Sequence, residues 1–299
     1  MINFFKILPL LILFLRIDCI SQSAPSEHKV ENVKIGFSIQ LFDEVDISDA
    51  TVAIKLFGDE LTKGVKDKYS PLMKIYKNNA EIINDFNKDS LDIISVLTLD
   101  YFKLFQEIEI FPGLTTGINE TPGHEYLVLV RKENNFKSLL DLKGKKILLP
   151  LNNYGRLGKI WLETSLANLG VKNFETFFGK IKYAEKPTQA VLPVFFKGFD
   201  ACIVPKSYFE TMCELNPQLK IELAVLAKSP HLVNALICLR KDLKDEIQNV
   251  FRDISLRLSK HTSGQQLLSL FGAKQLVLFQ PSLFEETEKL YKQYQSLKK

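Results

Sequence analysis

The sequence has few of the residues from which reactive or metal-binding sites are usually built. Its four histidines lie far apart, and none has a cysteine or acidic partner at metal-ligand spacing. The chain also lacks the GxSxG, GxxxxGK[ST] and GxGxxG motifs of hydrolases, P-loop proteins and dinucleotide-binding enzymes. We therefore expect no catalytic residue, no metal site and no cofactor, and a protein that is not an enzyme.

Cysteine is also scarce, and its number excludes a complete disulfide framework. Of the four cysteines, Cys19 lies in the N-terminal segment, and removal of that segment leaves an odd number. Cys202 and Cys238 lie in apolar, strand-like runs, so we expect them to be small buried hydrophobic residues. A disulfide bridge between Cys202 and Cys213, which lies in the following helix, remains a possibility.

Neither charge sign is in strong excess, and no segment is repeated or low in complexity. The 39 basic and 35 acidic residues are mixed throughout, whereas nucleic-acid-binding proteins usually carry a basic stripe. The composition therefore excludes a nucleic-acid partner and a repeat protein. With 299 residues, 46% of them hydrophobic, the chain can form two lobes with a core each.

The N-terminal apolar run is too short to span a membrane. It covers residues 7–15 and ends at Arg16, whereas a membrane helix needs about 20 apolar residues. A basic residue precedes the run and small residues follow it, namely Lys6, Ser21, Ser23 and Ala24. This pattern predicts a cleaved secretory signal over residues 1–23. Asp18 precedes Cys19 where lipidated cysteines follow a small residue, so lipidation is disfavoured.

Strands and helices alternate along the chain, which is typical of parallel sheets covered by helices. Apolar runs predict strands at 33–39, 72–76, 91–96, 125–131, 146–149, 181–183, 201–204, 221–227 and 232–239. Helical spacing predicts helices at 50–61, 80–86, 98–105, 156–169, 188–196, 207–215, 243–260, 265–271 and 282–297. Ser48 is the expected N-cap of the first helix, and the glycines and prolines between residues 113 and 123 predict a loop.

The strand pattern restarts after Arg131, and the strand at 232–239 can return the chain to the first sheet. We therefore predict an α/β fold with two lobes, each a mostly parallel sheet flanked by helices. Lobe one takes residues 32–130 and 235–299, and lobe two takes residues 131–234. A lobe inserted in this way requires two crossing segments, and hence a hinge and a cleft.

The stretch from Glu125 to Arg156 has the layout of a ligand site. It ends one strand, builds another, and stops at a polar turn before a helix. In an open α/β sheet, ligands lie at the carboxyl ends of strands, where helix N-termini present unpaired N–H groups. The candidate ligand-binding residues at this turn are Asn152, Asn153, Tyr154, Gly155 and Arg156. For Arg156, a solvated position in the first helical turn is the alternative.

Lobe one offers a second set of candidates at the ends of two strands. Ser38 and Phe42 follow the first strand, and Thr98 and Tyr101 follow the strand at 91–96. Their hydroxyls could bind a ligand, and their aromatic rings could enclose an organic substituent. Ordinary core packing and helix capping are the alternative for each of them.

Three segments together resemble the phosphate, phosphite and phosphonate substrate-binding proteins of ABC transporters. They are GFSIQLFDEVDISDATVAIKLFGDEL, EYLVLVRKENNFKSLLDLKGKKILLP and AVLPVFFKGFDACIVPKSYFETMCELNPQLK. The resemblance covers residues 33 to about 240. It implies the two-lobed type II periplasmic-binding fold with a two-strand hinge.

The resemblance also implies where a ligand binds. In that family, hydroxyl and backbone N–H groups at the first helix of lobe two hold the phosphoryl oxygens. This chain has asparagine amides at Asn152 and Asn153, which can also donate to an anion. Asp200 matches an aspartate that lies near the family's cleft, although it could instead anchor its strand through backbone N–H groups. Thr188 stands where the family often has a histidine, and either ligand contact or helix capping is open.

The family implies a non-catalytic periplasmic solute-binding protein that closes over a small oxyanion. Its partners would be that ligand, of the phosphate, phosphite or phosphonate class, and an ABC permease in the membrane; we expect a monomer. One alternative is a receptor component that reports ligand occupancy to a sensor kinase. Another is an enzyme on the same fold, similar to the pyrimidine-precursor synthases of thiamine biosynthesis.

Overall fold

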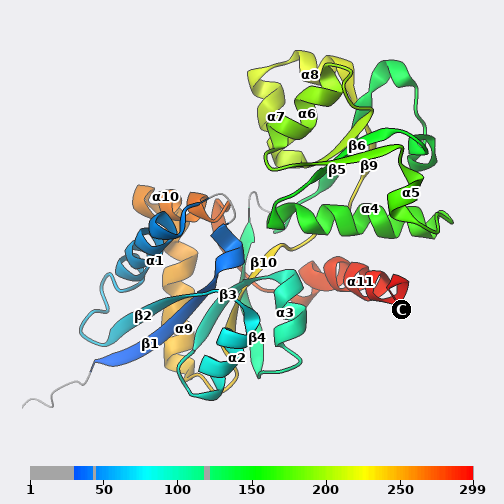
Figure 1. Cartoon of the computed structure of the whole chain (residues 1–299). Helices are drawn as coiled ribbons and strands as arrows, with labels where there is room; N and C mark the ends of the chain where they lie inside the picture. The colour runs from blue at the N-terminus through cyan, green and yellow to red at the C-terminus, as the bar shows by residue number, and fades with distance from the viewer. Residues whose placement is uncertain (1–29, 43–44, 118–121, 299) are drawn as a thin grey trace, which may run out of the picture.

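The chain builds two β-sheets, each with helices on both faces (Figure 1). The computed structural model describes residues 30–42, 45–117 and 122–298. We call the body around the first sheet lobe one and the body around the second sheet lobe two. This arrangement confirms the predicted two-lobed α/β fold. The predicted signal segment, residues 1–23, lies outside the described residues.

Lobe one is built on a sheet with the strand order β11-β4-β10-β3-β1-β2. Its strands are β1 (Glu31–Ser38), β2 (Tyr69–Tyr76), β3 (Ile93–Leu97), β4 (Ile110–Gly117), β10 (Ala235–Arg240) and β11 (Gln275–Leu278). One face packs on α1 (Ile47–Leu61), α9 (Asp245–Arg257) and α10 (Thr262–Leu270), and the other on α2 (Asn79–Asn87) and α3 (Thr98–Leu104). A short 3-10 helix, η1 (Ile39–Phe42), follows β1.

Lobe two is built on a sheet with the strand order β7-β6-β8-β5-β9. Its strands are β5 (Tyr126–Arg131), β6 (Lys146–Pro150), β7 (Lys180–Ala184), β8 (Ala201–Pro205) and β9 (Leu223–Lys228). One face packs on α4 (Arg156–Asn168) and α5 (Phe174–Phe177), and the other on α6 (Pro187–Phe195), α7 (Lys206–Leu215) and α8 (Gln218–Glu222). A 3-10 turn, η4 (Asn153–Gly155), leads from β6 into α4.

Both sheets are mixed rather than mostly parallel. In lobe one β10 runs antiparallel to β3 and β4, and in lobe two β5 runs antiparallel to β8 and β9. Each of these strands receives the chain as it crosses from the other lobe. Because β5 pairs within the second sheet, the chain leaves lobe one before Tyr126 and not after residue 130.

Strand β4 occupies part of the region that the sequence predicted as a loop, so that prediction was wrong. Pro112 and Gly113 lower its strand propensity, but β10 and β11 flank it and supply its hydrogen bonds. The pairing with β10 shifts register between Ile237 and Cys238. A Cβ atom on Gly113 would lie 2.2 Å from Leu239 Cδ1, so glycine permits this close approach. Tertiary pairing therefore overrides local propensity here.

The two crossing segments pair with each other and form the hinge. The His124 N–H donates to the Leu232 carbonyl at 2.9 Å, and the Leu232 N–H donates to the His124 carbonyl at 3.0 Å. Gly123 precedes this pair with a φ of 85°, and a Cβ atom there would lie 2.5 Å from the Leu232 carbonyl oxygen. Glycine therefore allows the chain to turn tightly into the hinge.

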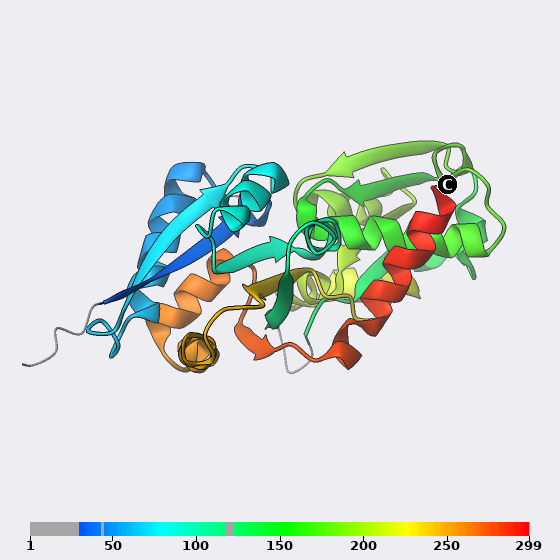
Figure 2. The same ribbon diagram turned by 90° about the horizontal axis from the view of Figure 1, so that it is seen from below.

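The C-terminal helix α11 (Pro281–Leu297) packs on both lobes, although the sequence analysis assigned it to lobe one alone. Figure 2 shows α11, in red, crossing the green helix α4. Tyr291 stacks on Phe102 of lobe one with 4.0 Å between ring centroids. Lys298 forms an ion pair of 2.6 Å with Glu163 of lobe two. The helix is therefore a further connection between the lobes besides the hinge.

The structure also settles local predictions about the cap of α1 and about the cysteines. Asp46, not Ser48, caps α1, because the Asp46 carboxylate accepts the Ser48 N–H at 2.8 Å. Cys202 and Cys238 are fully buried, as predicted. Both are free, as is Cys213, so the open possibility of a bridge from Cys202 to Cys213 is not realised.

Candidate functional site

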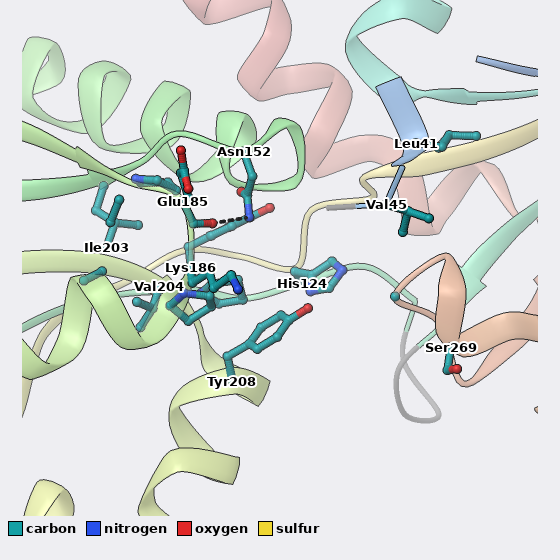
Figure 3. Close-up of a pocket in the computed structure, with 17 residues that line it drawn as sticks. Leu41, Val45, His124, Asn152, Glu185, Lys186, Ile203, Val204, Tyr208 and Ser269 are labelled. Atoms are coloured by element: carbon teal, nitrogen blue, oxygen red, sulfur yellow. Dashed lines mark hydrogen bonds between the residues drawn. The ribbon is translucent and has the colours of Figure 1, made fainter. Parts of the chain in front are cut away.

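A cavity of about 270 Å³ lies between the two lobes beside the hinge. Lobe one contributes Leu41, Val45, Ser269 and Gly272 to its lining, and the hinge region contributes His124 and Tyr126. The polar side chains from lobe two are Asn152, Glu185, Lys186 and Tyr208. In Figure 3, Leu41, Val45 and Ser269 lie across the cavity from Asn152 and Lys186, and His124 lies between these groups. A ligand in this cavity would contact both lobes.

The wall from lobe two consists of the carboxyl ends of three parallel strands. β6 ends at Pro150, β7 at Ala184 and β8 at Pro205, and all three residues line the cavity. The turn η4 with α4, and the helices α6 and α7, begin directly after these strand ends. The positive ends of the α6 and α7 helix dipoles therefore lie at this edge, which suits an anion.

The turn after β6 is held by the side chain of Asn152. Its Oδ1 accepts the Gly155 N–H at 2.9 Å, and its Nδ2 donates to the Glu185 carbonyl at 3.3 Å. A Cβ atom on Gly155 would lie 2.2 Å from Pro150 Cβ, so the turn can fold onto the strand end only with glycine. Asn152 thus links the turn after β6 to the turn after β7.

The turn after β7 brings a lysine to the cavity. Gln189 accepts the backbone N–H groups of Glu185 and Lys186 at 3.1 and 3.3 Å, which fixes the start of α6. The Lys186 ammonium has no hydrogen bond or ion pair with the residues that the structure describes. It is therefore a positive charge available to a ligand at the positive end of a helix.

The hinge supplies a buried imidazole. His124 is 9% exposed, and its Nδ1 has no hydrogen-bond partner among the described residues. Burial, with a smaller contribution from nearby His231, lowers the pKa of His124 from 6.5 to about 4. The ring is therefore uncharged at neutral pH. The next residue, Glu125, is bound by Lys206 at 2.7 Å and Lys228 at 2.9 Å, which anchors this end of the hinge.

The residues that the sequence suggested in lobe one are packed inside it. Ser38 and Phe42 are 2% and 5% exposed, and Phe42 lies against Phe271 with 5.4 Å between ring centroids. Thr98 is fully buried, and its hydroxyl donates to the Val233 carbonyl at 2.6 Å. Tyr101 packs among the aromatic rings of α3 and α11, and burial raises its pKa to about 12. None of the four lines the cavity.

The candidates of lobe two are divided between the cavity and other places. Asn152 lines the cavity, and Tyr154 and Gly155 lie in the turn beside it. Asn153 donates to Gln40 Oε1 of lobe one at 2.6 Å, so it joins the two lobes directly. Arg156, in the first turn of α4, has no hydrogen-bond or ion-pair partner among the described residues.

Thr188 and Asp200 do not line the cavity either. Thr188 is an exposed residue in the first turn of α6, whose N-cap is Lys186. Asp200 precedes β8 at the end opposite the cavity, where its carboxylate accepts the Lys146 N–H at 2.8 Å. That bond is the strand-anchoring alternative considered from the sequence. Ligand contact by the candidate residues stays a prediction.

The polar cavity residues missed from the sequence include His124, Lys186 and Tyr208, together with Glu185 and Ser269. Lys186 and Tyr208 follow β7 and β8 directly, so the strand-end rule that identified Asn152 would have found them if applied to every strand of lobe two. His124 has no such signal. Its place depends on the pairing of two hinge segments that are far apart in the sequence.

The described residues offer no metal site and no membrane-spanning helix. No group of three or more His, Cys, Asp or Glu side chains there is placed to hold a metal ion. Within the same residues, no helix combines the length and apolar character that crossing a membrane requires.

A family profile described as "ABC transporter, phosphonate, periplasmic substrate-binding protein" matches residues 48–284. Among solved structures, XAC2383 from Xanthomonas citri bound to ATP aligns with a TM-score of 0.62 and 13% identity, covering 89% of this chain and 98% of that one. PhnD1 from Prochlorococcus marinus in complex with methylphosphonate aligns with a TM-score of 0.58 and 18% identity, covering 88% and 98%.

The binding protein component of an ABC phosphonate transporter from Pseudomonas aeruginosa has a TM-score of 0.58 and 16% identity, covering 90% of this chain and 88% of that one. At such identities these likenesses show the fold alone, which is that of periplasmic binding proteins. No curated protein matches the chain in sequence. The family profile, however, spans most of the chain, from α1 into α11. The chain therefore belongs to the periplasmic substrate-binding proteins of phosphonate ABC transporters.

Proposed function

We propose that this protein binds a small oxyanion of the phosphate, phosphite or phosphonate class in the cavity between its lobes and delivers it to an ABC importer. One observation carries the proposal. The N-terminal ends of α6 and α7 and the turn residue Asn152 meet at one wall of the cavity, where Lys186 adds an unpaired positive charge. Such a wall favours an anion over a neutral or cationic ligand.

Membership of the family supplies the coarser part of this function. It implies a small-molecule ligand, a membrane permease as partner, a periplasmic location and a role in transport. PhnD1, which shares the fold, was solved in complex with methylphosphonate, and this supports an oxyanion with phosphorus at its centre. The proposal extends the family's role to that ligand class for this chain.

The two walls give the ligand a way to change the shape of the protein. An oxyanion that binds Lys186 and Asn152 on lobe two would also contact Leu41, Val45 or Ser269 on lobe one. Such a ligand prefers the closed arrangement, because only that arrangement brings both walls to it. Closure would then be the signal that the permease recognises.

Calorimetric titration of the chain without residues 1–23 tests the ligand class. The ligands are phosphate, phosphite, methylphosphonate and sulfate, and we expect one phosphorus oxyanion to bind most tightly. Bound at about 1,000 times its Kd, it should add roughly 4 kcal/mol to the free energy of unfolding. Absence of binding by all three phosphorus oxyanions would contradict the proposal.

A matched pair of lysine variants tests the position of the anion. Lys186→Gln should weaken binding about 10- to 100-fold, because it removes a charge-assisted hydrogen bond. Lys180→Gln removes the same charge from an exposed site at the start of β7, away from the cavity, and should leave affinity nearly unchanged. Equal effects of the two variants would mean that only the overall charge matters.

A further inference from the structure

His124 is a polar group of the cavity that the anion site does not explain. It lies on the hinge, lines the cavity, and keeps its Nδ1 without a hydrogen-bond partner among the described residues. Buried polar atoms are nearly always paired, and an unpaired one in a binding protein calls for an explanation. This atom has almost no accessible surface, so a ligand in the adjoining cavity becomes its partner once the ring turns about the Cβ–Cγ bond.

The surroundings of His124 favour an uncharged partner. Its ring carries no charge at neutral pH, so it offers a hydrogen bond and not an ion pair. The Glu125 carboxylate is bound by Lys206 and Lys228. The Glu185 carboxylate points away from His124 (Figure 3). An ammonium group placed against the ring would therefore be buried without a counter-charge, which is unfavourable.

The rest of the cavity suits a ligand with a carbon skeleton. Apart from the polar groups already described, its lobe two lining consists of Pro150, Ala184, Pro187, Ala190, Ile203, Val204 and Pro205. A bare inorganic anion would leave this apolar surface and His124 without contacts. An anion with a short organic substituent would cover the surface and bring a polar atom to the imidazole.

We propose that His124 selects the ligand by hydrogen bonding to an uncharged polar group, such as a hydroxyl, on the organic substituent of the anion. This inference rests on the proposed binding of an oxyanion in the same cavity. It adds a second recognition point to that site. Lobe two holds the charged head, and the hinge imidazole distinguishes among substituents.

Two phosphonates of nearly equal size test the inference. 2-Hydroxyethylphosphonate carries the hydroxyl, and ethylphosphonate lacks it. By calorimetry the unmodified chain should bind the hydroxyl compound at least tenfold more tightly, since a site built to hydrogen-bond a hydroxyl discriminates against the analogue without it. 2-Aminoethylphosphonate, which carries an ammonium group, should bind less tightly than the hydroxyl compound.

Two variants assign the preference to His124. His124→Phe keeps an aromatic ring but cannot form the hydrogen bond, so the tenfold preference for the hydroxyl compound should disappear. His124→Gln retains hydrogen-bonding groups and should keep part of the preference. Circular dichroism establishes that both variants are folded. Equal binding of the two phosphonates by the unmodified chain, or a preference that survives in His124→Phe, would overturn the inference.

A second pair of anions separates this inference from the proposed ligand class. 2-Hydroxyethanesulfonate and ethanesulfonate differ by the same hydroxyl but contain no phosphorus. If the phosphonates fail to bind while the sulfonates show a preference that His124→Phe removes, the phosphorus class is wrong and the role of His124 stands. If neither pair shows the preference, the role of His124 is overturned.

Discussion

The two walls of the cavity arise at the same kind of strand end but differ in chemistry. In lobe two, the ends of β6, β7 and β8 open onto the cavity and are followed by polar turns and helix N-termini. In lobe one, β1 and β3 also end near their following helices, yet Ser38 and Thr98 are buried. Position at a strand end is therefore not enough to make a residue part of a binding surface.

Aromatic packing explains the difference. Phe37 and Phe42 pack with Phe271 at centroid distances of 5.7 and 5.4 Å, and Phe57 packs on the same group. This cluster fills the end of lobe one that faces the cavity. Lobe one therefore lines the cavity with Leu41 and Val45, and not with the residues at the ends of β1 and β3. Lobe two has no such cluster at its cavity edge among the described residues, and its helix starts stay accessible.

Protonation of His124 at the hinge, where both walls meet, should have the largest effect on stability. The pKa of His124 is about 4 in the folded chain and 6.5 as its ordinary value, so the unfolded chain binds a proton that the folded chain does not. Its stabilising contribution is present above pH 6.5 and is lost as pH falls toward 4. At 1.36 kcal/mol per unit, the loss should reach about 3 kcal/mol.

Urea unfolding at a series of pH values measures this loss. His124→Phe should reduce the fall in the free energy of unfolding between pH 7 and pH 4 by about 3 kcal/mol relative to the unmodified chain. The charged neighbours Glu125, Lys206, Lys228 and His231 are present in both proteins, so the two profiles differ by the change at residue 124. Identical pH profiles would show that His124 does not titrate as its burial requires.

The substitution Gly155→Ala should disrupt the turn after β6 in the cavity wall of lobe two. The added methyl group would lie 2.2 Å from Pro150 Cβ, so the turn after β6 must move. We expect stability to fall by about 2 kcal/mol, as for other overpacked sites, and oxyanion affinity to fall more than tenfold. Gly170→Ala is the control, since its added methyl group meets no neighbour within 4 Å, although its φ of 88° adds a strain of its own. Unchanged affinity in Gly155→Ala would remove this turn from the site.

In lobe one, Thr98→Val should affect stability and leave ligand binding alone. The substitution keeps the shape of the side chain but removes the hydroxyl that donates to the Val233 carbonyl at 2.6 Å. The buried carbonyl loses a partner, and we expect a loss of about 1 to 2 kcal/mol in urea unfolding. A large loss of affinity with unchanged stability would instead place Thr98 in the binding site, as first predicted.

Much of the fold could be predicted because its signals are local. Strands such as Tyr126–Arg131 are short apolar runs, and the helices after them carry regular apolar spacing. The failures have one physical cause. Strand β4 forms despite Pro112 and Gly113 because other strands pair with it, and only the folded chain brings those strands together. The antiparallel direction of β5 and β10 likewise depends on strands that are distant in the sequence.

The site was less predictable for the same reason. Asn152 could be found, since it follows a recognisable strand and precedes a helix. The burial of Ser38 and Thr98 could not be predicted, because it results from aromatic and hinge residues far away in the sequence. The contact of Asn153 with Gln40 could not be predicted either, since the two residues belong to different lobes.

That contact gives the smallest expected effect, and it tests whether Asn153 acts on the ligand or on the other wall. Asn153 Nδ2 donates to Gln40 Oε1 at 2.6 Å, so the bond favours approach of the two lobes. Removing it by Asn153→Ala should cost closure about 1 kcal/mol, which corresponds to roughly a fivefold loss of ligand affinity. The population of closed molecules without ligand should fall as well, as measured by fluorescence energy transfer between dyes on the two lobes.

A double-mutant cycle between Asn153→Ala and Gln40→Ala separates the two roles. If Asn153 acts through Gln40, the double variant should bind no more weakly than either single variant, because one shared bond is lost in all three. If Asn153 contacts the ligand directly, as the sequence first suggested, the losses should add. If the losses of affinity add and the energy-transfer signal does not change, Asn153 contacts the ligand directly. The bond between Asn153 and Gln40 would then have no effect on closure of the two lobes.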